Sequence, residues 1–321
     1  MSLEVASLLD GPTSCLKTPV EHWSGAGGNR FQFLRNLRRH LRSSPDLILL
    51  NHVHQLPFLG LAASGLSTKE VAVILHGIEA WRPLSKTRRF GLSRVTRMIY
   101  VSDFTRRRAI EASPQLAGIK GLVCHHGLLP ENGSTSVKPI SDRSPAPFVL
   151  MIGRMSSQEQ YKGYEEVIRA WGKVRAIRPQ LELILVGDGD DRGRLEEIAA
   201  GSEGVRFTGQ VSDAERDRLI HESVAFALPS RGEGFGLVYL EAMRAGKPVV
   251  AGSLDAGAEV IVDGVTGRAV DPREEAQLVT VLADVTSEAG PRMGQAGRQR
   301  YLENFTFESY ASRLRTVIEG H

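Results

Sequence analysis

The chain has 321 residues, of which 41% are hydrophobic and 24% charged, with a formal net charge of +3, so it is long enough for two domains and apolar enough to build their cores. No apolar run reaches the roughly 18 residues of a membrane span, and no signal-peptide pattern opens the sequence. Two cysteines, Cys15 and Cys124, exclude a disulfide framework and a cysteine zinc site, so we expect a protein of the reducing cytoplasm.

Apolar runs and helical patterns alternate along the first half of the chain. The runs predict strands at Glu4–Leu9, Asp46–Leu50, Val71–Leu75, Met98–Val101 and Gly121–Cys124. Between them, 3.6-residue periodicity predicts helices at Phe31–Leu41, Ser85–Leu92 and Phe104–Ala112. A segment rich in Pro and Ser, Lys138–Pro147, follows and indicates a linker. These elements predict a first domain over residues 1–143.

The second half repeats the alternation. Strands are expected at Phe148–Ile152, Leu181–Val186, Val205–Phe207, Val224–Leu228 and Val249–Ala251. Helices are expected at Tyr164–Arg178, Arg192–Ala200, Ala214–Glu222 and Val238–Ala245. They predict a second domain over residues 147–304, and residues 305–321 are expected to form a helix that packs back toward the first domain. Strand–helix alternation with short turns implies an α/β protein with parallel, doubly wound sheets, which bind ligands beyond the carboxyl ends of their strands.

Two cations follow the first strand of the second domain. Gly153 and Arg154 stand at the predicted carboxyl end of that strand, and Lys162 precedes the next helix. An Arg that forks onto two oxygens beside a Lys that acts as a point charge suits a diphosphate. The alternative is that both are solvated surface charges.

A glycine-rich loop with two glutamates follows the strand Val224–Leu228. The sequence from 230 to 236, "SRGEGFG", leads into a helix, and such glycines let backbone and helix N–H groups approach an anion closely. Glu233 lies in this loop, where it could accept hydrogen bonds from sugar hydroxyls. Glu241 lies inside the helix, at most about 12 Å further on at ~1.5 Å per residue. The alternative for Glu241 is an exposed helix residue.

Taken together, these motifs resemble the retaining, nucleotide-sugar-dependent glycosyltransferases of family 4, which have the GT-B fold. The second half carries "GR…YKG", "LVGDGDDRGRLE", "FTGQVSD", "LPSRGEGFGLVYLEAMRAGKPVVA" and "DGVTGRAVDP" in the family's order. The first half offers looser matches in "WSGAGGNR", "LHGIEAW" and "VSDFTRR". The resemblance implies two Rossmann-like domains that face a cleft.

The resemblance also implies roles for the donor-side residues. Glu233 and Glu241 match the family's Glu-x7-Glu motif, in which the first glutamate meets the donor sugar and the second the nucleotide ribose. Arg154 and Lys162 would hold the diphosphate. Sugar and phosphate would be lined by the amides of Gly234, Phe235, Gly236 and Leu237.

Three further positions follow from the same resemblance. Gly27 and Gly28 match the glycine pair through which the first domain touches the diphosphate, and the loop with Gln210 and Val211 would lie near the base. His76 matches a histidine that faces the donor sugar and the acceptor at a strand end. The alternative for His76 is a buried residue with its hydrogen bonds satisfied.

The expected activity is metal-independent transfer of a sugar, with retention, from a UDP- or GDP-linked donor to a hydroxyl of a glycan, lipid-linked or small-molecule acceptor. The resemblance implies cell-envelope polysaccharide biosynthesis and no cofactor. The run "GDGDD" could suggest an Asp-x-Asp metal motif, but Asp188 and Asp190 are expected in an ordinary strand-to-helix turn. The alternatives are a catalytically silent GT-B binding subunit and a sugar-nucleotide epimerase.

Charge is divided unevenly along the chain. Residues 1–145 hold 19 Lys and Arg against 10 Asp and Glu, whereas residues 146–321 hold 21 against 27. The basic pattern "RFQFLRNLRRHLR", residues 30–42, suits an anionic membrane surface or a lipid-linked acceptor, so a peripheral position on the inner membrane face is expected. The alternative is a helix that packs its apolar stripe on the sheet. Nucleic acid is not expected, because the basic stretches lack interleaved aromatic residues and any reader motif.

Overall fold

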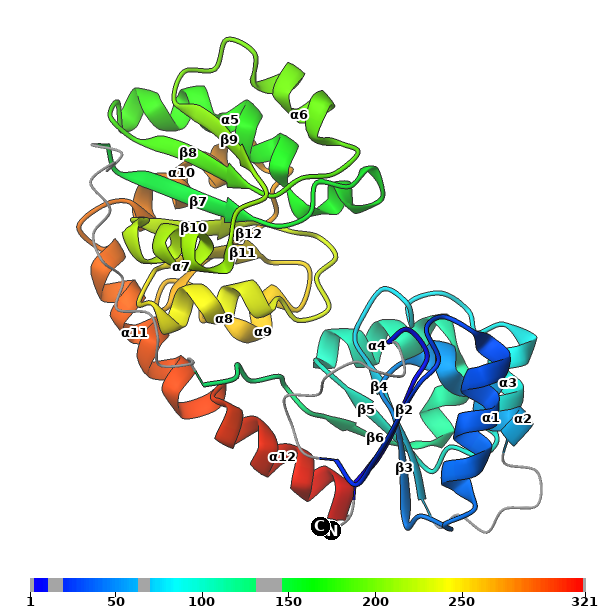
Figure 1. Cartoon of the computed structure of the whole chain (residues 1–321). Helices are drawn as coiled ribbons and strands as arrows, with labels where there is room; N and C mark the ends of the chain where they lie inside the picture. Colours follow the sequence, from blue (N-terminus) through cyan, green and yellow to red (C-terminus); the bar gives the residue numbers. More distant parts are fainter. Residues whose placement is uncertain (1–2, 11–19, 63–69, 131–145, 320–321) are drawn as a thin grey trace. The chain divides into compact units, whose positions relative to one another are not determined.

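The computed structural model describes residues 3–10, 20–62, 70–130 and 146–319 (Figure 1). The chain forms two compact units, Met1–Val101 with Thr105–Val123 and Ser102–Phe104 with Cys124–His321. The predicted linker Lys138–Pro147 lies outside the described residues except for its last two positions. Each unit is built around its own parallel sheet.

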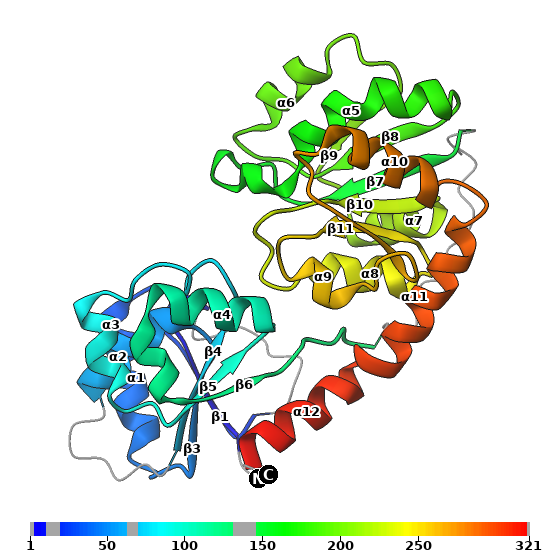
Figure 2. The same ribbon diagram turned by 180° about the vertical axis from the view of Figure 1, so that it is seen from behind.

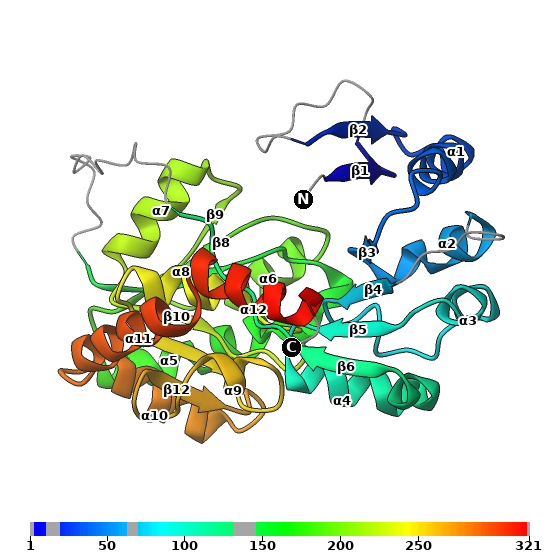
Figure 3. The same ribbon diagram turned by 90° about the horizontal axis from the view of Figure 1, so that it is seen from below.

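The first unit contains a four-stranded parallel sheet in the order β3-β4-β5-β6 and a separate parallel pair, β1-β2 (Figure 3). The strands are β1 (Glu4–Ser7), β2 (His22–Gly25), β3 (Leu47–Leu50), β4 (Glu70–Leu75), β5 (Arg97–Tyr100) and β6 (Lys120–Val123). β4 and β5 are almost completely buried, as expected for central strands covered on both faces.

The helices of the first unit are α1 (Arg30–Leu41), α2 (Leu56–Ala62), α3 (Lys86–Leu92) and α4 (Asp103–Ala112), with 3-10 turns η1 (Val53–Gln55) and η2 (Pro114–Gly118). Asn29 caps α1 by accepting hydrogen bonds from the next turn. The apolar stripe of α1, formed by Phe33, Leu37 and Leu41, is buried in the core, whereas Phe31 is 87% exposed. This apolar stripe therefore packs into the core of the first unit, as the alternative to membrane binding predicted.

The second unit has a six-stranded parallel sheet in the order β12-β11-β10-β7-β8-β9. The strands are β7 (Phe148–Ile152), β8 (Glu182–Val186), β9 (Val205–Gly209), β10 (Ala225–Leu228), β11 (Val249–Gly252) and β12 (Gly267–Val270). The chain runs outward from β7 to β9 and then returns to β10, so the crossovers before the return and those after it cover opposite faces. This reversal between β7 and β10 makes the sheet doubly wound and creates a switch point at their carboxyl ends.

Helices cover both faces of that sheet (Figure 2). On one face α5 (Tyr164–Ile177) packs against α6 (Arg192–Ala199) and α10 (Glu275–Val285). On the other, α8 (Leu237–Arg244) packs against α7 (Asp213–Glu222) and α11 (Gly290–Asn304). The remaining elements are η3 (Ser157–Lys162), α9 (Gly257–Val260) and α12 (Phe307–Glu319). Among the largest fully buried side chains are those of Trp171, Phe226 and Tyr239.

Several elements were not predicted. They include the short β2, β12, α2 and α9, which give too few repeats of a pattern, and also the longer helices α10 and α11 of the second unit. The segment from Cys124 belongs to the second unit, since Leu128 pairs with Thr306 and the Arg313 guanidinium donates to the His125 carbonyl at 3.0 Å. No helix within the described ranges is long and apolar enough to cross a membrane.

Candidate functional site

The carboxyl edge of the second unit's sheet is closely packed around the switch point. Gly163, in the left-handed conformation at φ 79°, caps the start of α5, and a Cβ there would stand 2.5 Å from the Pro229 carbonyl oxygen. The Arg231 amide donates to the Tyr161 carbonyl at 2.8 Å, so the segments after β7 and β10 are joined. Only glycine permits this approach, and it brings the predicted cations toward the predicted glutamate loop.

Arg154 and Lys162, predicted as a pair, meet on one carboxylate. Nζ of Lys162 lies 2.8 Å from Oε2 of Glu159, and the Arg154 guanidinium forks onto both oxygens of the same group. The Lys162 side chain is only 12% exposed, whereas that of Arg154 is 70% exposed. Lys162 is therefore not a solvated surface charge; Arg154 is exposed but fixed by its partner.

Glu159 is a charged group at this edge. Burial by itself raises the pKa of Glu159, but hydrogen bonds from Arg154 and Lys162 outweigh it and leave the pKa below its ordinary value. The carboxylate thus holds two cations side by side, an arrangement that fits two neighbouring phosphate groups.

Glu233 lies in the loop after β10, and hydrogen bonds to Asp255 fix the backbone of this loop. The buried Asp255 carboxylate accepts hydrogen bonds from the Glu233 amide at 2.8 Å, from the Gly257 amide at 2.9 Å and from the Ser230 hydroxyl. This network fixes the backbone of residues 230–233 against the start of α9. Asp255 was missed by the sequence analysis; its position three residues after the buried strand β11 was the available signal.

The Glu233 carboxyl group is desolvated. Burial raises its pKa to about 7; the positive charge of Lys162 acts against this shift, while Asp255 and Glu159 add to it. No described residue donates a hydrogen bond to this carboxylate. A half-buried acid beside a cation, with no hydrogen bond from the described residues, is poised to accept hydrogen bonds from a polar ligand.

α8 starts beside this loop. Gly236 caps it in the left-handed conformation, at φ 86°, and a Cβ there would stand 2.4 Å from the Tyr239 ring. The amides of Gly234, Phe235, Gly236 and Leu237 thus stand at a helix N-terminus, where the partial positive charge suits an anion.

Glu241 is a half-buried residue of α8, not an exposed one. Burial raises its pKa, and the charges of Arg216 and Arg244 oppose that rise. Oε1 of Glu241 lies 3.7 Å from Arg216, on α7.

Gln210 is exposed and Val211 half-buried in the turn between β9 and α7. Gln210 and Val211 follow the carboxyl end of β9, and their contact with a nucleotide base remains a prediction.

The acidic run after β8 is a structural turn. The Asp190 carboxylate accepts from the Ser157 amide at 3.0 Å and from the Ser157 hydroxyl at 2.5 Å, and Asp188 accepts from the Gly189 amide. Within the described part of the chain, no three His, Cys, Asp or Glu side chains gather in a way that could hold a metal ion.

Gly27 and Gly28, in the first unit, form a tight turn between β2 and α1. Their φ angles are 54° and 85°, and their amides donate to the carbonyls of Asp10 and Leu8 at 2.8 and 2.6 Å. A Cβ at either position would meet nothing within 4 Å, so the turn presents open backbone. It follows the unpredicted strand β2, which accounts for the long segment after β1.

His76 stands at the carboxyl end of β4, as predicted. Its Nε2 lies 2.8 Å from the Asn51 carbonyl oxygen, and its amide donates to the Glu79 carboxylate at 2.6 Å. The ring is half-buried and lies 6.3 Å, centroid to centroid, from that of His52. His76 is therefore fixed from two strand ends, and its catalytic role stays a prediction.

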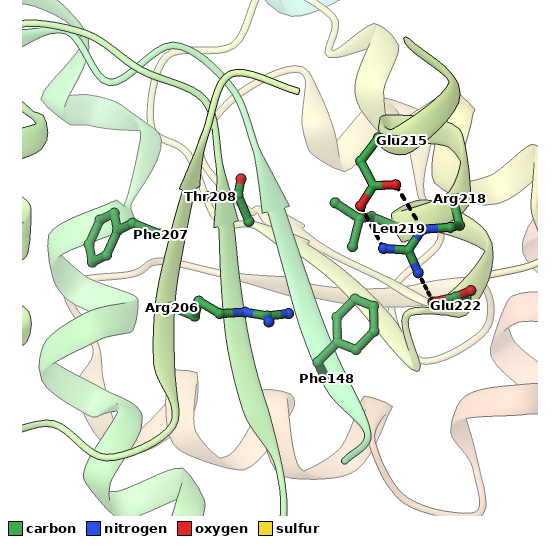
Figure 4. A pocket seen from close by; sticks show the side chains of 8 residues that line it. All are labelled: Phe148, Arg206, Phe207, Thr208, Glu215, Arg218, Leu219 and Glu222. Carbon is green, nitrogen blue, oxygen red and sulfur yellow. Dashed lines mark hydrogen bonds and ion pairs between the residues drawn. The ribbon is translucent and has the colours of Figure 1, made fainter. Parts of the chain in front are cut away.

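A pocket of about 300 Å³ lies in the second unit, away from these groups (Figure 4). It is lined by the first residue of β7, by strand β9 and by helix α7. Arg218 crosses it between Glu215 and Glu222, at 2.5 Å from each. Because its charges neutralise one another, this pocket offers no obvious anion site. Its lining consists of Phe148, Arg206, Phe207, Thr208, Glu215, Arg218, Leu219 and Glu222.

Comparison with known proteins relates the chain to glycosyltransferases. Residues 146–288 match the family model described as "Glycosyl transferases group 1". A GDP-mannose-dependent alpha-(1-6)-phosphatidylinositol monomannoside mannosyltransferase of Mycolicibacterium smegmatis is 28% identical over 287 residues, which cover 83% of this chain and 74% of that protein. A phosphatidyl-myo-inositol mannosyltransferase of Mycobacterium tuberculosis is 29% identical over 311 residues, covering 92% and 76%.

Solved structures show the same fold. HepE of Anabaena, in complex with UDP and glucose, superimposes with a TM-score of 0.72 at 20% identity over 94% of this chain and 86% of that one. Sucrose-phosphate synthase of Thermosynechococcus elongatus gives a TM-score of 0.70 at 20% identity, covering 91% and 79%. The expected α/β class with the GT-B fold is thereby confirmed.

Proposed function

We propose that this chain is a retaining glycosyltransferase that moves a sugar from a nucleoside diphosphate sugar to an acceptor hydroxyl. The observation that carries the proposal is the pairing of Arg154 and Lys162 on Glu159, beside the desolvated carboxyl group of Glu233. Relatives named for GDP-mannose and a neighbour solved with UDP and glucose support a nucleotide-sugar donor.

The two cations would act on the leaving group. As the bond from the anomeric carbon to the diphosphate oxygen breaks, negative charge grows on that oxygen, and Arg154 and Lys162 would stabilise it. The Lys162 side chain is only 12% exposed, so its charge is screened less than that of a surface lysine. The acceptor hydroxyl would enter on the same face, and the departing phosphate would take its proton. No protein nucleophile is required in this scheme.

The two glutamates would divide the donor between them. Glu233 would accept hydrogen bonds from sugar hydroxyls, because its desolvated carboxylate has no hydrogen bond from the described residues. Glu241 would hold the ribose from inside α8, while the amides from Gly234 to Leu237 would face sugar and phosphate. Gly27 and Gly28 would add backbone contacts to the diphosphate, and Gln210 and Val211 would lie near the base.

The proposed reaction needs no metal ion, since Arg, Lys and helix amides supply the positive charge. Activity should therefore persist in excess EDTA. Loss of activity in chelator, restored by magnesium or manganese, would contradict this part of the proposal.

The acceptor would be a glycan, a small molecule or a lipid-linked sugar, with His76 near its hydroxyl. The names of the mannosyltransferase relatives favour an acceptor with a phosphatidylinositol-type headgroup. We also propose that the chain associates peripherally with the cytoplasmic face of an anionic membrane, because exposed Phe31 lies beside the exposed arginines of α1, Arg35 and Arg38.

The donor assignment is tested by thermal-shift measurements with UDP, GDP, UDP-glucose and GDP-mannose. A nucleotide and its sugar conjugate should stabilise the chain, by RT ln(1 + [L]/Kd). NMR of the donor with an acceptor should then show a product with the donor's anomeric configuration. A new epimer without acceptor would indicate an epimerase, and binding without any turnover would indicate a silent binding subunit.

A further inference from the structure

Three histidines gather at one edge of the first unit's sheet. His52 and His54 follow β3, and His76 follows the neighbouring strand β4. The rings of His52 and His54 lie 4.4 Å apart and those of His52 and His76 lie 6.3 Å apart, centroid to centroid. Because β3 and β4 are parallel, this is the carboxyl edge, where open α/β sheets bind their ligands.

An arginine lies on α3, which packs against the 3-10 turn η1 that holds His54. Arg88 lies in the first turn of α3, where the Ser85 hydroxyl caps the helix by accepting from the Arg88 amide at 3.4 Å. Arg88 is half-buried, whereas its neighbour Arg89 is exposed. Among the described residues no carboxylate pairs with the Arg88 guanidinium. A half-buried guanidinium without an anion is costly unless a ligand completes it.

The nearest carboxylate is used elsewhere. Glu79 accepts from the amides of His76 and Gly77 at 2.6 and 3.1 Å, so it serves the turn after β4. Burial lowers the pKa of His52 and of His54, Arg88 lowers both further, and the charge of Glu79 only partly compensates. For His52 the neighbouring imidazoles of His54 and His76 act in the same direction as Arg88. Burial and the positive charge of Arg88 therefore disfavour the protonated forms of both rings.

We propose that His52, His54 and Arg88 form an anion site that binds a phosphate group of the acceptor. The fork of Arg88 matches two phosphate oxygens, and the two imidazoles can donate further hydrogen bonds, that of His52 through Nε2, because its Nδ1 accepts from the His54 amide at 3.1 Å. That the phosphate belongs to the acceptor rests on the proposed function, in which Arg154 and Lys162 hold the donor diphosphate and His76, whose ring lies 6.3 Å from that of His52, is near the acceptor hydroxyl.

Phosphate binding and histidine protonation should reinforce each other. A dianion beside His52 and His54 favours their charged forms, so it raises their pKa, and by reciprocity phosphate binds more tightly as pH falls through those values. Arg88→Gln alone should also raise both values, because a neighbouring positive charge has gone. The two effects separate once phosphate is added.

The test is an NMR pH titration of the full chain with ¹³C-labelled histidine, with and without 10 mM inorganic phosphate. His52→Gln and His54→Gln assign the two signals. In the wild type, phosphate should raise both pKa values; in Arg88→Gln its dissociation constant should increase about tenfold or more. Arg88→Lys keeps the charge but not the fork and should fall between them. Arg89→Gln, on the same helix, is the matched control and should behave as the wild type.

Two results would overturn the proposal. One is an absence of any phosphate-induced change at His52 and His54 in the wild type; the other is equal phosphate affinity in Arg88→Gln and the wild type. The double variant Arg154→Ala and Lys162→Ala, which lacks the other candidate phosphate site, should show the same phosphate-induced changes at His52 and His54.

Two further arms identify the source of the phosphate. Glucose 1-phosphate represents a soluble phosphorylated acceptor, and vesicles that contain phosphatidylinositol represent a lipid headgroup. The probe that shifts the two histidine signals at the lower concentration identifies the kind of acceptor that carries the phosphate. Donor binding, followed separately by thermal shift with UDP and GDP, should be unchanged in Arg88→Gln. If no nucleotide binds while phosphate still moves His52 and His54, the proposed function fails and the anion site stands.

Discussion

The substitution Glu233→Gln should stabilise the second unit in a pH-dependent way. The unfolded chain releases the Glu233 proton near pH 4.5, whereas burial holds the folded value at about 7. Between these values the folded state binds more protons than the unfolded state, so the stability of the wild type falls as pH rises through this window. Glutamine cannot ionise and is spared that loss.

The size of the effect follows from the two pKa values. Each unit of difference corresponds to about 1.4 kcal/mol, so the change from 4.5 to about 7 amounts to roughly 3 kcal/mol at pH 8. At pH 4 both side chains are neutral and the difference should vanish. For a unit of this size, 3 kcal/mol corresponds to roughly 6–12 °C in melting temperature.

Differential scanning calorimetry from pH 4 to pH 8 measures this difference, and Glu159→Gln is the matched control. The pKa of Glu159 is lowered in the folded state, so its stabilising contribution is present at neutral pH and is lost as pH falls through the folded value. Glu159→Gln should therefore destabilise the protein at pH 8, and the difference from the wild type should begin to shrink only below the unfolded value of 4.5. Equal melting temperatures of Glu233→Gln and the wild type at pH 8 would refute the desolvation argument.

Three other outcomes are expected. Lys162→Ala and Arg154→Ala should each lower turnover about 10²-fold or more, because each removes a cation from the leaving diphosphate; wild-type turnover in either would exclude that role. Glu241→Ala should weaken binding of the nucleoside diphosphate, whereas Glu233→Ala should weaken only the intact donor, and calorimetry with both ligands would reveal identical losses if this division is wrong. The full chain should co-sediment with anionic vesicles at low salt, since each basic residue near the surface contributes about 1 kcal/mol and salt screens this attraction. Phe31→Ser should weaken the association, because it removes an exposed apolar side chain. Recovery in the supernatant with anionic and neutral vesicles alike would contradict membrane binding.

The sequence by itself determined the fold class and the edge at which chemistry is expected. Alternating apolar runs and helical patterns require parallel strands, and parallel strands place every strand-to-helix turn of a unit at one edge. Arg154, Lys162, Glu233 and His76 all occupy such turns, so their placement at the carboxyl edges followed from local pattern alone. The motifs that resemble family 4 glycosyltransferases extended this to roles that local pattern does not contain.

The partners of these residues were decided by the tertiary structure. That Asp255 fixes the Glu233 loop depends on contact between segments 22 residues apart, and the charge of Arg88 acts on His52 because α3 packs against the turn after β3. Periodicity reports which side of an element is apolar but not which neighbour it meets, and in α1 it did not separate buried Phe33 from exposed Phe31. Burial and charge partners set the pKa of Glu233 and the pairing of Arg154 with Glu159, and both arise only when the chain is packed, because desolvation and Coulomb interactions depend on distance in space rather than along the sequence.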